Sequence, residues 1–498
     1  MSNILSLAFA LFLGAACLVY YVLPRFARSA WLLCCSYLFY LYDPANAVYV
    51  LLLAGVTGVT YLAGLALEAA RARWLRRCVL AACCIGCFGV LAWFKYSRAL
   101  AAAAGAIAGL FGARAPGAPS VAVPLGISYF LFMAAGYLID VYRRKTPAVR
   151  NVFDYALFVS FFPLMTAGPI ERADHLIPQF QKLPRFDYDR FCGGMFRILW
   201  GFFKKMVIAD TLGGAIGQVY GNLHYEAYTG PVVLLASLLF SFRLYCDFAA
   251  CSDIAVGAAQ LFGIDLIENF RRPFSASSFT ELWRRWHISL TSWLRDYVYI
   301  PLGGNRCGKA RTYLNQIVTF IVSGLWHGGS LPYAVWGLLN GVFLSFGKLT
   351  AARRRRIMRH NPLYHFAPVR RVCCAAVNYL LFTACIVFFA VGLYNTQPGA
   401  IADAFYVYGH IFTGWGELAS AWPAFLETLD GIGLDSSALF ALVAGTALME
   451  ALEWPQIPVH KLIRKVPIFI RWPLYYVLCL GILFFGSLGQ SGFIYQNY

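Results

Sequence analysis

Long apolar runs alternate with short polar segments along almost the whole chain. The continuous runs lie near 3–23, 47–70, 78–95, 121–140, 229–249, 331–350, 372–394 and 473–488. Shorter or broken runs bring the expected total to about 11 to 13. A run of about 17–25 apolar residues can cross a bilayer as a helix. The pattern therefore predicts an all-α, polytopic integral membrane protein, in which some short runs enter the membrane without crossing it.

The apolar runs are continuous and do not alternate with polar residues, which favours helices over a closed barrel. In lipid, each backbone polar group needs a partner inside the protein, and a helix provides one within its own segment. No linker separates two globular halves. The sequence therefore predicts a single polytopic membrane domain over residues 1–498.

Composition and charge agree with a membrane location. Hydrophobic residues make up 60% of the 498 residues and charged residues only 13%, while the formal net charge is +18. The basic residues gather in loops between apolar runs, where the positive-inside rule places them in the cytoplasm. Residues 395–436 carry acidic side chains and no Lys or Arg, so we expect them outside. Membrane lipids are the expected surroundings, and nucleic acid is not an expected partner.

The segment 268–311 differs from the rest because it mixes aromatic residues with arginines, a histidine and small polar residues. We expect a helix over 280–297, begun by Ser278 or Thr280 as the capping residue. This helix is too polar to face lipid. The sequence predicts that it lies inside the protein as an interior or re-entrant helix, where ionisable groups usually mark a functional site.

Charged residues near this segment are expected to pair with one another, because unpaired charges at membrane depth are costly. We predict one interior polar network that holds the helix in place without doing chemistry. Its expected members are Asp247, Asp253, Arg284, Arg285, Arg295 and Asp296.

Two of the eight histidines, His287 and His327, have aromatic neighbours in segments expected at membrane depth. A buried imidazole stays neutral and can act as a general base on a hydroxyl that attacks an acyl thioester. The same burial also fits two histidines that only form hydrogen bonds between helices. The residues alone leave both interpretations open. No metal site is expected, because the cysteine cluster at 83–87 lacks charged or imidazole partners.

Two long motifs make the sequence recognisable. The segment "ENFRRPFSASSFTELWRRWHISLTSWLRDYVYIPLGGNR" is followed by "GLWHGGSLPYAVWGLLNG", and shorter matches run from "PLGISYFLFMAAGYLIDVYR" to the terminal "FIYQNY". Together they resemble the membrane-bound O-acyltransferase (MBOAT) family, in its alginate O-acetyltransferase and bacterial polysaccharide acetylation branch. The chain departs from the family pattern at Ala250-Cys251, where Gly-Tyr is usual, and at Leu164, where Gln is usual. These departures bear on substrate details.

The resemblance implies a ring-like helical bundle around a central tunnel, with His327 as the catalytic histidine and His287 as the second motif histidine. It implies transfer of an acyl group, with acetyl as the expected group, from a cytoplasmic thioester donor to hydroxyls of an extracytoplasmic polysaccharide or to a partner transferase. D-alanyl transfer to teichoic acid from a carrier protein is the alternative. A proton-coupled transporter is a remote third possibility, because no paired inverted repeats are evident.

The resemblance also sets the expected co-substrates and partners. No cofactor is expected to stay bound, and the acyl thioester, either acetyl coenzyme A or a carrier-bound acyl group, enters as a co-substrate. A secreted acetyltransferase and an acyl carrier protein are possible protein partners. The expected location is the bacterial inner membrane, crossed many times. The sequence leaves the residues that bind the donor unknown.

Overall fold

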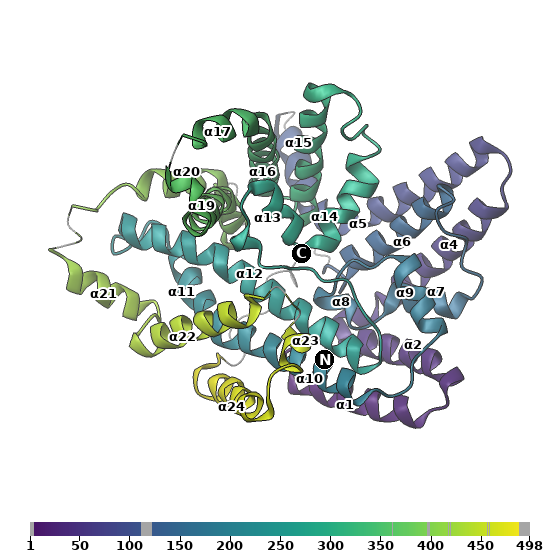
Figure 1. Ribbon diagram of the computed structural model, residues 1–498. Coiled ribbons are helices and arrows are strands. Elements are labelled where there is room, and N and C mark those ends of the chain that lie inside the picture. The colour runs from purple at the N-terminus through teal and green to yellow at the C-terminus, as the bar shows by residue number, and fades with distance from the viewer. Residues whose placement is uncertain are drawn as a thin grey trace. The chain divides into compact units, whose positions relative to one another are not determined.

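The computed structural model describes residues 4–110, 122–360, 362–395, 399–416, 418, 420–455, 457 and 459–487, and all regular structure in this part of the chain is helical (Figure 1). The prediction of an all-α protein is therefore confirmed. The terminal "FIYQNY" motif lies outside the described residues.

The helices of the first half of the chain vary from four-residue turns to long rods. Their bounds are α1 (Leu7–Val22), α2 (Arg25–Leu41), α3 (Pro44–Ala47), α4 (Val50–Ala69), α5 (Arg73–Leu110), α6 (Ile127–Tyr142), α7 (Val152–Ser160), α8 (Leu164–Ala167), α9 (Ala173–Gln181), α10 (Tyr188–Phe203), α11 (Asp210–Gly221) and α12 (Gly230–Leu261). A π-helical turn, Lys204–Ala209, joins α10 to α11.

The second half begins with short interior helices and ends with longer apolar ones. Their bounds are α13 (Phe279–Arg285), α14 (Ile288–Leu294), α15 (Gly308–His327), α16 (Leu331–Leu349), α17 (Ala351–Met358), α18 (Pro362–His365), α19 (Ala367–Tyr394), α20 (Ala400–His410), α21 (Trp422–Gly431), α22 (Ser436–Glu453), α23 (Val459–Ile463) and α24 (Ile468–Phe485). A 3₁₀ turn, Pro273–Ser275, precedes α13, and a π-helical turn, Arg295–Tyr299, follows α14.

Within the described part of the chain, six helical segments are long and apolar enough to cross a membrane, and a bent pair of helices, α16 and α17, would make a seventh. The six are Pro44–Ala69, Arg73–Ser97, Gly230–Leu261, Ala367–Tyr394, Ser436–Glu453 and Ile468–Phe485. The count is lower than the 11 to 13 apolar runs for a physical reason. Some runs break into short helices, as at α7 and α8. Residues 194–213, one of the shorter apolar runs of the sequence, contain two lysines and a π-helical turn.

The described residues form two compact units whose segments alternate along the chain. Among the described residues, the first unit contains those of 4–198 and 251–268, and the second contains those of 199–250 and 269–487. Because the chain passes between the units three times, at 198/199, 250/251 and 268/269, no single linker divides it. One membrane domain over 1–498 stays a prediction.

The first unit contains its own buried ion cluster. Arg197 on α10 donates from Nε to Asp253 Oδ1 at 2.8 Å and from Nη1 to Glu268 Oε1 at 2.7 Å. The two carboxylates neutralise a guanidinium that is almost completely buried. Burial alone would lower the pKa of Arg197, but the carboxylates raise it above its ordinary value, so the cluster stays ionised.

The second unit contains both candidate catalytic histidines, and α15 and α16 lie side by side in it (Figure 1). The two helices approach closely because glycines face carbonyl groups across the contact. A Cβ atom on Gly324 would collide with the Tyr333 carbonyl oxygen, and one on Gly337 would collide with the Phe320 carbonyl oxygen. The small residues therefore let the two backbones touch, which fixes the end of α15 against the start of α16.

Candidate active site

His327 is the last residue of α15, and only 3% of it is exposed. Three aromatic rings surround its imidazole in edge-to-face contacts. The ring centroids lie 4.7 Å away for Trp326, 5.1 Å for Trp336 on α16 and 5.2 Å for Phe389 on α19. The rings fix the orientation of the imidazole and surround it with apolar surface.

His287 lies at a break in the chain, where the sequence predicted a continuous helix. The expected helix 280–297 is wrong: it divides into α13, α14 and a π-helical turn. Trp286 is extended, and His287 adopts a left-handed conformation with φ 42° and ψ 56°. A non-glycine residue in this region stores roughly 1–3 kcal/mol of strain, which persists only where surrounding contacts hold it.

Asn269 provides those contacts. Its carbonyl oxygen accepts a hydrogen bond from Ile288 N at 2.9 Å. Its side-chain oxygen accepts two more, from Ser289 Oγ at 2.6 Å and from Ser289 N at 3.3 Å. Asn269 therefore bonds both residues that follow His287 and stabilises the break.

The imidazole of His287 is 2% exposed and packs against the Phe248 ring, with centroids 4.6 Å apart. Neither ring nitrogen has a hydrogen-bond partner within the described protein. His287 lies outside the candidate membrane spans, and its burial lowers the pKa to about 3. The ring is therefore neutral at physiological pH, with one nitrogen that can donate a hydrogen bond and one that can accept.

A single indole ring connects the two histidines. The Trp326 ring centroid lies 5.9 Å from that of His287 and 4.7 Å from that of His327. Residues 40 positions apart in sequence thus lie around one side chain. The arrangement places both buried imidazoles against the same indole ring.

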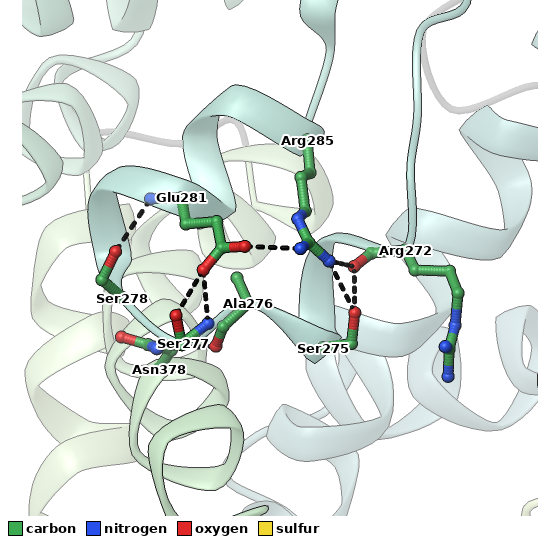
Figure 2. A network of polar contacts seen from close by, with 8 residues as sticks. All are labelled: Arg272, Ser275, Ala276, Ser277, Ser278, Glu281, Arg285 and Asn378. Carbon is green, nitrogen blue, oxygen red and sulfur yellow. Dashed lines mark hydrogen bonds and ion pairs between the residues drawn. The ribbon is translucent and has the colours of Figure 1, made fainter. Parts of the chain in front are cut away.

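Glu281 organises the start of α13, as Figure 2 shows. Ser278 caps the helix by accepting from Glu281 N at 3.1 Å, which confirms one of the two expected caps. The Glu281 carboxylate accepts from Ser277 N at 2.8 Å and also pairs with Arg285. Burial opposes ionisation of Glu281, but the Ser277 hydrogen bonds and the Arg285 charge hold its pKa below the usual range.

The same network extends to the segment before the helix and to α19. Arg285 donates from Nη1 to Ser275 Oγ at 2.8 Å, and Asn378 on α19 donates from Nδ2 to the Ala276 carbonyl at 2.9 Å (Figure 2). These contacts hold both the 3₁₀ turn before α13 and the last residue of α13, Arg285. They therefore fix the segment that leads into the Trp286–His287 break.

Comparison of the sequence with known proteins shows the family to which the chain belongs. The sequence profile of the membrane-bound O-acyltransferase family matches residues 142–391, a region that contains both histidines and Trp326. The chain belongs to this family. It is an O-acyltransferase and a multi-pass bacterial membrane protein, and it uses an acyl donor as co-substrate.

Several named proteins are similar in sequence to this MBOAT chain over much of their length. The chain is 39% identical over 337 residues to the probable alginate O-acetylase AlgI of Pseudomonas putida, which covers 67% of each chain. It is 32% identical over 368 residues to the peptidoglycan O-acetyltransferase of Helicobacter pylori, with 67% of this chain and 68% of the relative covered. The teichoic acid D-alanyltransferase of Bacillus subtilis is 31% identical over 238 residues, with 44% and 58% covered.

The structure does not support the predicted single network in this MBOAT protein. Arg284 and Arg295 are exposed, and Arg295 pairs only with its neighbour Asp296 at 2.8 Å among the ion pairs described. Asp253 pairs with Arg197 in the first unit, whereas Asp247 pairs with Lys205 in the second. The prediction is wrong because Asp247 and Asp253 pair with basic residues of other segments, Lys205 and Arg197, and not with the arginines of 284–295.

A buried charge cluster that the sequence prediction missed lies beside the histidine site. Lys205, fully buried in the π-helical turn, lies 2.6 Å from Asp210 Oδ1 and 2.7 Å from Asp247 Oδ1. Asp247 immediately precedes Phe248, which packs on His287. Two adjacent lysines inside an apolar run were the signal in the sequence. Their partners could not be read from it, because Asp247 lies far away along the chain.

The described part of the MBOAT chain contains no group of three or more His, Cys, Asp or Glu residues that could hold a metal ion. Phe389, Trp336 and Asn269 also belong to the site, although the sequence did not single them out. Phe389 comes from a segment far from His327 in sequence, and Asn269 acts on the residues that follow His287, so neither contact could be read from the local pattern.

The left-handed backbone of His287 predicts that a glycine variant at this position is more stable than an alanine variant. Replacement by Ala and by Gly removes the same ring, but Gly adopts φ 42° without strain. We expect His287→Gly to be more stable than His287→Ala by about 1 kcal/mol. The thermal unfolding midpoint of each purified variant measures the difference.

Thr291 on α14 provides the matched control, because it lies in an ordinary right-handed helix. There Gly should be less stable than Ala by about 1 kcal/mol. If Gly is the less stable residue at both positions, the left-handed conformation at residue 287 is not the source of strain.

Proposed function

We propose that the protein transfers an acyl group, with acetyl as the expected group, from a thioester donor on the cytoplasmic side to a hydroxyl on the far side of the membrane. The acceptor is an extracytoplasmic polysaccharide, reached directly or through a partner transferase. The observation that carries the proposal is the pair of buried imidazoles around Trp326. Relatives named as alginate and peptidoglycan O-acetylases support the polysaccharide class.

His327 acts as the general base in this reaction. The acceptor hydroxyl lies within about 2.6–3.2 Å of one imidazole nitrogen, directly or through a water molecule. Its oxygen attacks the thioester carbonyl while the proton passes to His327. The carbon–sulfur bond then breaks, and the leaving thiolate takes the proton from the imidazolium. The cycle begins with a neutral imidazole, and the enclosing rings hold it in one orientation.

His287 acts as a neutral hydrogen-bonding group for a reacting oxygen. Its low pKa keeps it uncharged, and both of its buried nitrogens lack a partner within the described protein. A pre-organised donor aimed at developing negative charge lowers the barrier to acyl transfer. Asn269 would serve as a positioning residue, since it holds the backbone that presents the ring.

The donor is acetyl coenzyme A or a carrier-bound acyl group, and the protein works in the bacterial inner membrane. D-alanyl transfer from a carrier protein is the second candidate, supported by the teichoic acid D-alanyltransferases among the relatives. Those matches cover less than half of this chain, whereas the acetylases match two thirds of it. The acetyl group is therefore preferred.

Reconstitution in vesicles tests the proposed function. Acetyl coenzyme A, an acetylated carrier protein and a D-alanylated carrier protein are supplied as donors, with alginate oligosaccharides and peptidoglycan fragments as acceptors. We expect acetyl esters on a saccharide, detected by mass spectrometry and lost after mild alkali. Transfer of D-alanine alone, or no ester on either saccharide with or without a secreted acetyltransferase, would contradict the proposal.

A further inference from the structure

The second unit contains a cavity of about 610 Å³ whose lining includes neither His287 nor His327. It lies where the ends of α11 and α19 meet the start of α20, and we call it the α19 pocket. Six side chains of its lining carry the argument: Tyr220, Asn222, His224, Tyr394, Asn395 and Asp403. Its volume falls within the range of small-molecule sites, roughly 300–1,000 Å³.

One side of the α19 pocket is polar. The carboxylate of Asp403 is bonded at both oxygens, to His224 Nε2 at 3.2 Å and to the Asn395 side-chain amide. Amides, an imidazole and a carboxylate in one cavity offer both donors and acceptors of hydrogen bonds. A ligand rich in hydroxyl groups matches this set, because each hydroxyl can donate and accept.

The other side of the pocket is aromatic. The rings of Tyr220 and Tyr394 stack with centroids 5.9 Å apart, and Arg243 donates a hydrogen bond to the Tyr394 hydroxyl. Aromatic surface beside placed polar groups suits a ligand with an apolar face and a polar edge. A sugar ring has this character. The described lining contains no Lys or Arg, which makes the pocket a poor match for a donor that carries phosphate groups.

The helix α19 connects the pocket to the candidate active site. Phe389 packs on the His327 ring, and Tyr394 lies five residues further on, about 7.5 Å along the helix axis. A Cβ atom on Gly392, between them, would lie 3.3 Å from Pro332 just after the His327 segment. The charge pattern also predicts that the chain after Tyr394 lies outside the cell, where the acceptor would be.

We propose that the α19 pocket binds a sugar unit of the acceptor polysaccharide and thereby guides a neighbouring unit to His327. This inference rests on the proposed function. The polar side binds hydroxyl groups, and the Tyr394 ring, supported from behind by the buried Tyr220, covers the apolar face of the sugar. The pocket contributes to the acceptor KM and takes no part in the chemical step.

A bulky side chain at Asn222 tests the pocket, because this residue is exposed at its rim. Asn222→Trp should raise the KM for alginate oligosaccharides at least tenfold, while kcat and the KM for the acyl donor stay within twofold of wild type. Glu226→Trp is the matched control, since it places the same side chain at an exposed position of the same loop outside the lining. Asp403→Asn and His224→Ala test the polar side without filling the cavity.

The outcomes separate this inference from the proposed function. A raised acceptor KM in the pocket variants, with normal values for Glu226→Trp, supports the pocket as a sugar site. Unchanged acceptor KM values in an enzyme that acetylates saccharides overturn the inference and leave the proposed function intact. If the wild-type protein acylates neither alginate oligosaccharides nor peptidoglycan fragments, both proposals are overturned.

Discussion

Replacement of His327 by Gln is expected to abolish detectable acyl transfer while the protein stays folded in the membrane. Gln keeps the capacity to form hydrogen bonds, but it cannot take up the proton of the acceptor hydroxyl. A positioned general base contributes about 100- to 10,000-fold to the rate. The acyl content of the exported polymer, in cells that produce each variant at equal levels, measures the loss. His327→Ala should be equally inactive.

His365→Gln is the matched control, because it makes the same substitution at an exposed histidine that is not part of the aromatic enclosure of His327. That variant should acylate at the wild-type level. Near-normal acylation by His327→Gln would show that the imidazole only packs between Trp326, Trp336 and Phe389. The assignment of a general base would then have to be withdrawn.

Lys205→Met is expected to unfold the protein or severely reduce its stability. The change leaves Asp210 and Asp247 buried without the cation that lies within 2.7 Å of both. Removal of one member of a buried ion pair costs about 3–5 kcal/mol, because the remaining charge cannot be solvated. The fraction of monodisperse protein after detergent extraction and the thermal unfolding midpoint both measure the effect.

Two further variants show whether charge is the cause. Asp247→Asn in the Lys205→Met background removes one of the two orphaned charges, so it should recover part of the lost stability. Asp296→Asn removes a carboxylate from the exposed pair with Arg295 and should change stability by less than about 1 kcal/mol. A stable Lys205→Met protein would show that the cluster does not support the fold.

The sequence predicted those features that depend on local pattern. The helical class follows from the length of the apolar runs, and the cap at Ser278 follows from a motif of four residues. The two histidines could be selected because an imidazole among apolar residues is unusual. Their meeting at Trp326 could not be predicted from spacing, because 40 residues separate them.

The errors came from contacts between distant segments. Nothing in the segment 280–297 indicates a break, and the hydrogen bonds that stabilise it come from Asn269, upstream of the expected helix. The charge network failed for the same reason. Asp247 and Asp253 lie on one helix, yet their basic partners, Lys205 and Arg197, come from other parts of the chain.

The glycine contacts between α15 and α16 also limit how this active site can change. Because the backbones touch at Gly324 and Gly337, neither helix can slide or tilt toward the other without a collision. His327 and Trp336 therefore behave as parts of one rigid hairpin. In the proposed function, room for a larger acyl group beside His327 must come from a smaller ring near the imidazole, such as a substitution at Phe389 on α19. Variants meant to accept a different acyl group should therefore begin with substitutions outside α15 and α16.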